Sequence, residues 1–329
     1  MPDAQTTRLT RLRGGAVDLL RDAARTSWDL FKIMVPLLLL TRVLAELGVV
    51  GALGEALGPV MQVVGLPGEL GLVWATALVT NIYGAMAVFV EVAPDSITVA
   101  QVTVLSTMVL VAHALPVEGR ICQKAGPRLR AIALLRIGGA LLLGFLLHLI
   151  YSSAGALDQP STAFWNPGKT DGTWPAWAAS QARNLVLIFA IILLLLLLMR
   201  LLRWLGIRAL LTRLLEPVLR LLGMSRDAAP VTIIGMTMGL SYGGGLIIRE
   251  ARSGRLGERD IFFSLALMSL CHSLIEDTLL LAALGAHHSG ILWGRLGFAL
   301  AAVFLLARAL RRLPDAFFRR HLFRSRPAR

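Results

Sequence analysis

The sequence predicts an all-α polytopic membrane protein made of two inverted repeats, each with about three transmembrane helices and one re-entrant helical hairpin. Three observations support this prediction. The chain of 329 residues is 56% hydrophobic, with a mean hydropathy of +0.70, well above the level of a soluble domain. Several apolar runs reach the length of about 20 residues that a helix needs to cross a bilayer. A set of polar residues also recurs at a constant interval.

The recurring residues lie 159 positions apart in sequence that otherwise differs. The pairs are Tyr83-Gly84 with Tyr242-Gly243, Glu91 with Glu250, and His113 with His272. Polar residues are costly inside a bilayer, so a register of this kind indicates a duplicated membrane unit with a shared central site.

The first predicted unit covers residues 28–151. Residues 1–27 precede it as an arginine-rich amphipathic lead-in, which we expect on the cytoplasmic side. Trp28–Val50 is the first predicted span. The glycine-interrupted segment Gly51–Gly65 is expected to lie along the membrane surface.

A broken segment and two crossings complete this unit. Gly68–Val92 is apolar but interrupted around residues 80–84, which favours a re-entrant hairpin over a continuous span. Thr98–Leu115 is expected to cross and to stop at Pro116, because proline cannot donate the next helical hydrogen bond. Ala131–Tyr151 is expected to cross back.

Residues 152–183 are predicted to be a non-cytoplasmic linker. They are rich in Ser, Pro and Gly and poor in cations, and tryptophans such as Trp165, Trp174 and Trp177 favour the headgroup level.

The second unit, residues 184–310, repeats the plan and is followed by a basic cytoplasmic tail, residues 311–329. Its predicted segments are the span Asn184–Arg203, the amphipathic Ile207–Leu222, the broken Ala228–Ile248, and the spans Ile261–Leu284 and Ile291–Leu310. Arg136 and Arg295 each lie near the start of an apolar run, where we expect them to snorkel to the interface.

Cation placement predicts the orientation of the units. The basic segments, which should be cytoplasmic, are the N-terminus and residues 120–130, 200–226, 249–259 and 308–326. The cation-poor segments, which should face outward, are residues 51–69, 152–183 and 285–290. An odd number of crossings per unit then inverts the second copy. Both termini are expected in the cytoplasm, with the chain in a bacterial inner (plasma) membrane.

Several function classes are disfavoured. The net charge is +13, but the cations lie at helix ends without interleaved aromatics, so no nucleic-acid partner is expected. Cys122 and Cys271 form no CxxC motif, and no GxSxG nucleophile motif occurs. The sequence therefore predicts no enzyme activity and no cofactor.

The paired motifs resemble a known family. The segment TNIYGAMAVFVE of the first unit corresponds to GLSYGGGLIIRE of the second, and HALPVEGR corresponds to HSLIEDTL. These pairs resemble Gate-domain ("nucleoside recognition") membrane proteins, a group with spore-maturation membrane proteins and with Gate units in concentrative nucleoside transporters and ferrous-iron permeases. The resemblance covers about residues 28–310 and implies an inverted-repeat protein that moves a small solute. The chain lacks the GxxxxGK[ST] loop of the iron permease's GTPase, so nucleotide-driven gating is not supported.

The hairpin breaks are the candidate substrate site. Bare backbone groups at mid-membrane must line a cavity or meet a ligand, and the N-termini of half-helices attract anionic groups. The candidate residues are Asn81, Tyr83, Gly84, Ser241, Tyr242, Gly243 and Gly244. The alternative is that the glycines only permit close helix packing.

Histidines and acids form the candidate coupling or gating set. Its members are Glu91, His113, Glu118, Glu250, His272, Glu276 and Asp277. His272 and Glu276 would share a helix face, whereas the turn at Pro116 must open for His113 to meet Glu118. Proton coupling, substrate binding, a divalent-metal site and a structural His–acid pair all fit these residues. No metal ligands are assigned, because sulfur ligands and an HxxxH spacing are lacking. Glu91 and Glu250 suit a salt bridge as well as a coupling ion.

We predict a secondary transporter, or permease, for a small polar solute, which includes anionic and nucleoside-like molecules. Its partners are the solute, the lipid bilayer and a coupling ion, either a proton or sodium. The sequence is compatible with a homo-oligomer without specifying one. The alternatives are a divalent-metal permease or channel, and a non-transporting membrane scaffold.

Overall fold

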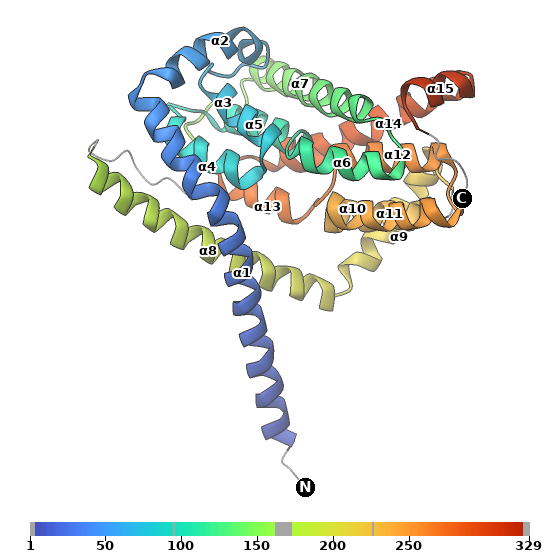
Figure 1. The fold of residues 1–329 in the computed structure, drawn as a ribbon, viewed down its shortest axis with the longest axis horizontal. Coiled ribbons are helices and arrows are strands. Elements are labelled where there is room, and N and C mark those ends of the chain that lie inside the picture. The colour runs from blue at the N-terminus through green and yellow to red at the C-terminus, as the bar shows by residue number, and fades with distance from the viewer. Residues whose placement is uncertain (1–3, 95, 162–172, 226, 325–329) are drawn as a thin grey trace.

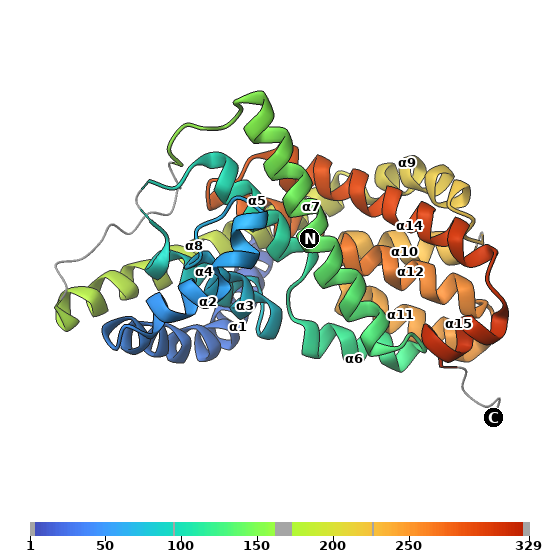
Figure 2. The same cartoon turned by 90° about the horizontal axis from the view of Figure 1, so that it is seen from above.

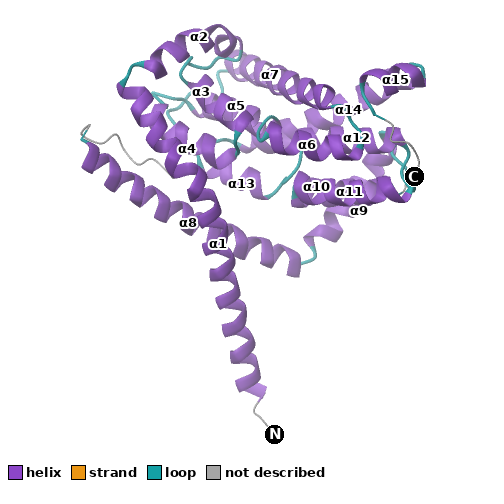
Figure 3. Ribbon diagram, viewed as in Figure 1, coloured by secondary structure: helices purple, strands orange, loops and turns teal. Residues whose placement is uncertain are grey.

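The computed structural model describes residues 4–94, 96–161, 173–225 and 227–324, and every regular element in these ranges is a helix (Figure 3). The predicted all-α class is therefore confirmed. Within these ranges, four stretches are long and apolar enough to cross a membrane: Val99–Ala125, Leu129–Ala154, Trp174–Leu202 and Ser289–Leu310. A fifth is the pair Val17–Glu46 and Val49–Val63, which is bent by 91°. The chain is thus a multi-pass membrane protein.

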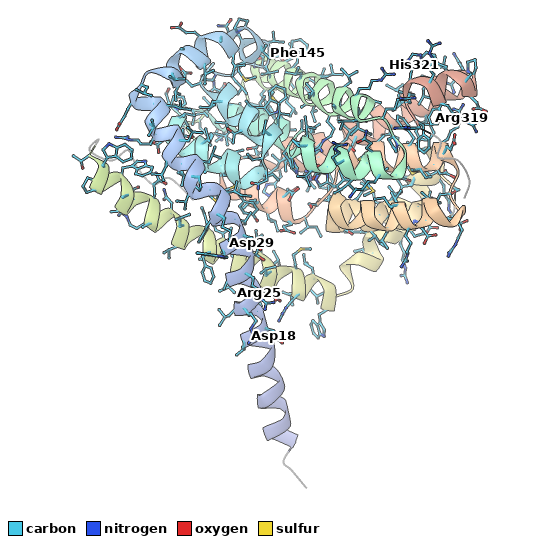
Figure 4. All side chains as sticks on the ribbon, viewed as in Figure 1. Asp18, Arg25, Asp29, Phe145, Arg319 and His321 are labelled. Atoms are coloured by element: carbon cyan, nitrogen blue, oxygen red, sulfur yellow. The ribbon has the colours of Figure 1, made fainter. Side chains whose placement is uncertain are left out.

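The first unit contains seven helices. They are α1 (Ala4–Glu46), α2 (Val49–Val63), α3 (Leu70–Val79), α4 (Ile82–Val92), α5 (Val99–Val111), α6 (Leu115–Ala125) and α7 (Leu129–Ala154). The predicted lead-in is not a separate element, because α1 runs without interruption from Ala4 into the first span. Its N-terminal part projects from the bundle and carries the exposed Asp18 and Arg25 (Figures 1 and 4).

The second unit repeats this helix order. Its helices are α8 (Trp174–Trp204), α9 (Ile207–Leu221), α10 (Ala228–Met238), α11 (Leu240–Ser253), α12 (Glu258–Leu270), α13 (Glu276–Ala283), the π-helical turn η1 (Ser289–Gly294), α14 (Arg295–Arg311) and α15 (Asp315–His321). Helices α5 and α12 are displaced by 159 residues at both ends, the interval of the sequence repeat. The 159-residue interval therefore appears in the secondary structure as well.

Both predicted hairpin breaks are present. Between α3 and α4 the chain breaks at Thr80-Asn81, and the Asn81 side chain caps α4 by accepting a hydrogen bond from the Gly84 N–H at 2.9 Å. Between α10 and α11 the break is at Gly239, whose φ of 97° suits glycine.

The two long crossings are not continuous, which corrects two predicted spans. In Thr98–Leu115, α5 ends at Val111 and α6 begins at Leu115, so Pro116 starts a helix instead of ending one. Proline is tolerated in a first helical turn because the N–H it lacks has no helical partner there. Ile261–Leu284 breaks in the same way between α12 and α13.

The segments flanking the second unit also differ from expectation. The C-terminal part of the predicted linker is helical from Trp174 onward, while Trp165 lies outside the described residues. Part of the basic tail forms α15, whose Phe318 is buried. Arg259 fastens this helix by donating to Asp315 at 2.8 Å, and that interaction holds the pKa of Asp315 below its usual value.

The two units pack against each other at the centre of the bundle. Helix α6 of the first unit lies beside α11 of the second (Figures 1 and 2). A Cβ atom on Gly244 would stand 2.4 Å from Ile121 of α6, so the helices approach closely there. Exposed aliphatic side chains such as Leu134 on α7 and Val186 on α8 face outward, as expected for lipid contact.

Glycine spacing in the second hairpin gives a stability prediction. A Cβ on Gly243 would lie 2.2 Å from the Gly235 Cα, whereas a Cβ on Gly245 would meet nothing within 4 Å. We expect Gly243→Ala to lower the free energy of unfolding by about 1–3 kcal/mol through overpacking, and Gly245→Ala not to lower it. Thermal unfolding of both variants in detergent checks this. Equal melting temperatures would show that α10 and α11 do not pack this closely.

Candidate functional site

Two histidines meet where the crossing helices break. His113 follows α5, His272 follows α12, and both side chains are buried. Their Nε2 atoms are 3.3 Å apart, and their ring centroids are 5.0 Å apart. The two residues are 159 positions apart, so each histidine touches its own counterpart. A contact of that kind is expected on a two-fold axis that relates two copies.

The histidines are held in the same way. His113 Nδ1 lies 2.9 Å from the Val109 carbonyl oxygen, and His272 Nδ1 lies 2.8 Å from that of Met268. A carbonyl oxygen only accepts hydrogen bonds, so each Nδ1 carries the hydrogen. In the neutral ring, each Nε2 then presents a lone pair toward the other histidine.

Glu118, in the first turn of α6, joins the pair. Its Oε1 lies 3.1 Å from His272 Nε2 and 3.6 Å from His113 Nε2. Its Oε2 forms an ion pair with Arg136 of α7. The turn at Pro116 therefore does bring His113 and Glu118 together, and the same carboxylate also reaches the histidine of the second unit.

Arg136 and Arg295 were not expected at the centre, and the predicted snorkelling is wrong for both. Their side chains are 0% exposed. Arg136 Nε donates to the Val111 carbonyl at 2.9 Å, and Arg295 donates to Thr278 Oγ1 at 3.2 Å. Val111 ends α5, so its carbonyl has no helical partner and attracts a donor. Arg136 and Arg295 are 159 positions apart, like the other recurring pairs. This spacing was the feature of the sequence that could have placed them in the central site.

The same interval pairs Glu118 with Asp277. Donor atoms of His113, His272 and Asp277 lie within 4.8 Å of one another. His272 precedes α13 and lies outside it, so the helical spacing expected between His272 and Glu276 does not apply. Glu276 acts on Asp277 electrostatically, as does Arg295. The central cluster thus comprises the residues His113, His272, Glu118, Asp277, Arg136 and Arg295.

Each hairpin break is tied to the crossing break of its own unit. The Ala114 N–H donates to the Ala77 carbonyl at 2.8 Å, and the Leu274 N–H donates to that of Met236 at 2.9 Å. Ala114 and Ser273 occupy equivalent left-handed positions, with φ of 46° and 45°. The breaks of both hairpins therefore lie next to the central cluster.

The hairpin candidates contribute unequally. Tyr83 is half-buried and interacts electrostatically with Glu276 and Asp277 of the second unit. Gly84 and Gly244 are buried at tight approaches, as the packing alternative predicts. The side chains of Ser241 and Tyr242 lie outside the described residues.

Glu91 and Glu250 have other partners. Glu91 accepts hydrogen bonds from Trp177 Nε1 at 3.1 Å and from Gln181 at 3.3 Å, and it lies 3.7 Å from Arg42. Glu250 lies 3.5 Å from Arg255. Both carboxylates therefore form salt bridges with arginines that are not members of the central cluster.

Comparison with known proteins supports the resemblance seen in the sequence. Residues 27–127 match the Gate family, whose description is nucleoside recognition, so the Gate-domain resemblance is confirmed for this region. The chain is 27% identical over 267 residues to the uncharacterized membrane protein YvoD of Bacillus subtilis (strain 168), covering 79% of this chain and 84% of that protein. No solved structure matches. The Gate match indicates a transport-related membrane protein.

The Arg136–Glu118 ion pair gives a prediction about stability. Arg136→Met would leave a buried carboxylate uncompensated, so we expect it to cost about 3–5 kcal/mol of unfolding free energy. Adding Glu118→Gln removes that charge, so the double variant should lose less than the sum of the two single losses, by about 1–3 kcal/mol. Denaturant titration in detergent measures this double-mutant cycle.

Arg130→Met provides the control for the cycle. Arg130 lies on the same helix and is exposed. Its replacement should change the unfolding free energy by no more than about 0.5 kcal/mol. Additive losses for Arg136 and Glu118 would show that the two side chains do not interact.

Proposed function

We propose that this Gate-domain membrane protein is a secondary permease for a small polar solute and that its two units are inserted in opposite orientations. The observation that carries the proposal is the buried His113–His272 contact, where one residue of each unit meets its counterpart among broken helices. Ionisable groups within a bilayer are costly, so a cluster of six such residues calls for a functional explanation. Discontinuous helices at a repeat interface are typical of secondary transporters.

Unequal contacts of equivalent residues support alternating access. Glu118 contacts both histidines and pairs with Arg136, whereas Arg295 donates to Thr278. In inverted-repeat transporters one repeat rocks against the other around a fixed site. Such a motion would let the two units exchange these contacts. In this proposal the opposite state has Asp277 paired with Arg295, and Glu118 released from the histidines.

The chemistry around Arg295 indicates the class of solute. Its Nε and Nη1, like Nη2 of Arg136, have no oxygen or nitrogen partner among the described residues, and its polar neighbours include the Cys271 thiol and Asp277. Buried guanidinium donors without acceptors are unfavourable, so a ligand oxygen bound there would be stabilised. We therefore propose a solute with a carboxylate, phosphate or carbonyl oxygen, bound between Arg295 and the hairpins near Asn81, Tyr83, Ser241 and Tyr242. The histidines and acids would gate its passage.

The tyrosines test the solute site. A solute at about 100 times its Kd should stabilise the purified protein by about 2.7 kcal/mol, which a thermal-shift panel of anionic and nucleoside-like metabolites would detect. Tyr83→Phe and Tyr242→Phe should each weaken binding by roughly 5- to 100-fold through a lost hydrogen bond. Tyr151→Phe is the matched control, because its hydroxyl is bonded to Ser289 at 2.7 Å, away from the hairpins.

The outcomes separate the proposed functions. Wild-type affinity in both hairpin variants would exclude this site. Accumulation of a divalent metal in vesicles, without any organic solute, would favour the metal permease that the sequence also allows. Absence of every ligand, with full tolerance of hairpin substitutions, would favour the scaffold.

Cysteine labelling tests the opposite orientation. Lys124, at the end of α6, is expected in the cytoplasm, whereas His288, after α13, is expected outside; both are exposed. A membrane-impermeant maleimide should label His288→Cys but not Lys124→Cys in intact cells, and both after permeabilisation. The native Cys122 and Cys271 are buried, so the unsubstituted protein sets the background. Labelling of both positions from the same side would rule out inversion.

A further inference from the structure

Three electron-pair donors converge at the centre of the fold. They are Nε2 of His113, Nε2 of His272 and Oε1 of Glu118, with mutual distances of 3.3, 3.1 and 3.6 Å. Both Nδ1 atoms donate to backbone carbonyls, so neither Nε2 of the neutral rings carries a hydrogen that could bridge the donors. Lone pairs facing each other at this distance repel unless a positive species lies between them, which is either a proton or a metal ion.

The distances match a metal-binding geometry. A tetrahedral zinc ion holds nitrogen and oxygen ligands at about 2.0–2.2 Å, which places the ligand atoms roughly 3.3 Å from one another. The three observed separations lie around this value. A fourth ligand is available from Asp277, whose carboxylate oxygen lies within 4.8 Å of the histidine nitrogens.

The surroundings of the three donors also fit a metal site. Metal-binding histidines usually donate their second ring N–H to a carbonyl or carboxylate, which fixes the ring orientation. Val109 and Met268 provide such carbonyls in equivalent positions. Arg136 binds Oε2 of Glu118 and leaves Oε1 directed at the histidines.

We propose that His113, His272, Glu118 and Asp277 bind one divalent first-row transition-metal ion, with zinc as the best fit to the two-nitrogen, two-oxygen donor set. The sequence left a divalent-metal site open at these residues without assigning ligands, because the ligands come from both units and no short motif contains them. Glu276 adds a third carboxylate that acts electrostatically on Asp277, so three acids outnumber the two arginines in this region, which favours a cation. The metal joins the two units at the axis that relates them.

Metal content and cobalt spectroscopy test the proposal. Full-length protein purified in detergent should contain about one zinc equivalent by elemental mass spectrometry. Chelator-treated protein should bind one Co²⁺, with the intense visible absorption of a tetrahedral complex. His113→Asn and His272→Asn should each weaken binding by more than the roughly 10- to 100-fold typical of second-shell changes.

His148→Asn is the matched control. His148 lines a separate cavity of about 190 Å³ with residues of α5, α7 and the turn after α2, so its loss should leave Co²⁺ binding unchanged. Size-exclusion chromatography identifies variants that fail to fold. The cobalt spectrum of the wild-type protein tests the proposal even if a histidine variant is lost in this way. A weak octahedral spectrum, no stoichiometric binding, or wild-type affinity in both folded histidine variants would overturn the proposal.

This site does not depend on the proposed solute transport, and the two fail separately. Bound metal in a protein that takes up no solute would leave the metal site intact. Solute uptake by a protein that binds no Co²⁺ would overturn the metal-site proposal and leave the transport proposal standing.

Discussion

The fold depends on satisfying backbone groups where helices break inside a bilayer. Lipid offers no hydrogen bonds, so each free N–H or C=O must find a partner within the protein. Asn81 caps α4, and Arg136 binds the carbonyl that ends α5. The N–H groups of Ala114 and Leu274 bond to carbonyls at the ends of α3 and α10. Polar residues of the candidate functional site, such as Asn81 and Arg136, therefore also stabilise the broken helices.

The same constraint explains why the charges collect where the two units meet. A helix break brings backbone dipoles into the interior, and each arginine that binds them needs a counter-charge. Glu118 supplies it for Arg136, and its other oxygen faces the histidines. Each unit contributes one histidine, one acid and one arginine, so neither unit could complete this network alone. The stability of each unit therefore depends on its contact with the other.

The sequence predicted the features that depend on local pattern. Hydropathy identified the apolar helices, and Asn81 and the glycines around Gly239 marked the hairpin breaks, because these residues suit caps and positive φ. The breaks in the crossing helices were missed because the second copy has no proline and the first has Pro116 inside the new helix. Such breaks are set by tertiary hydrogen bonds that sequence pattern does not contain.

The central arginines were misassigned for a related reason. Their position near the start of an apolar run is the same for a snorkelling residue and for one that turns inward toward a free carbonyl. The repeat interval distinguishes an inward-facing arginine from a snorkelling one. An arginine that only reaches the membrane interface needs no second arginine 159 positions away. Applied to Arg136 and Glu118, the interval gives Arg295 and Asp277. The sequence singled out His113 and His272 as a pair, and the contact between them depends on the tertiary packing of α5 and α12, which spacing alone does not give.

Two differences between the copies bias the cluster toward the observed arrangement. Asp277 is one methylene shorter than Glu118, so its carboxylate has less reach toward the histidines. Thr278 occupies the position of Gly119 and gives Arg295 a hydroxyl acceptor that Arg136 lacks. Arg295 therefore donates to a neutral hydroxyl, whereas Arg136 pairs with the Glu118 carboxylate in addition to its bond to the Val111 carbonyl. If the units exchange contacts, the opposite state is higher in free energy in the absence of a ligand, and a ligand that binds it preferentially must supply the difference.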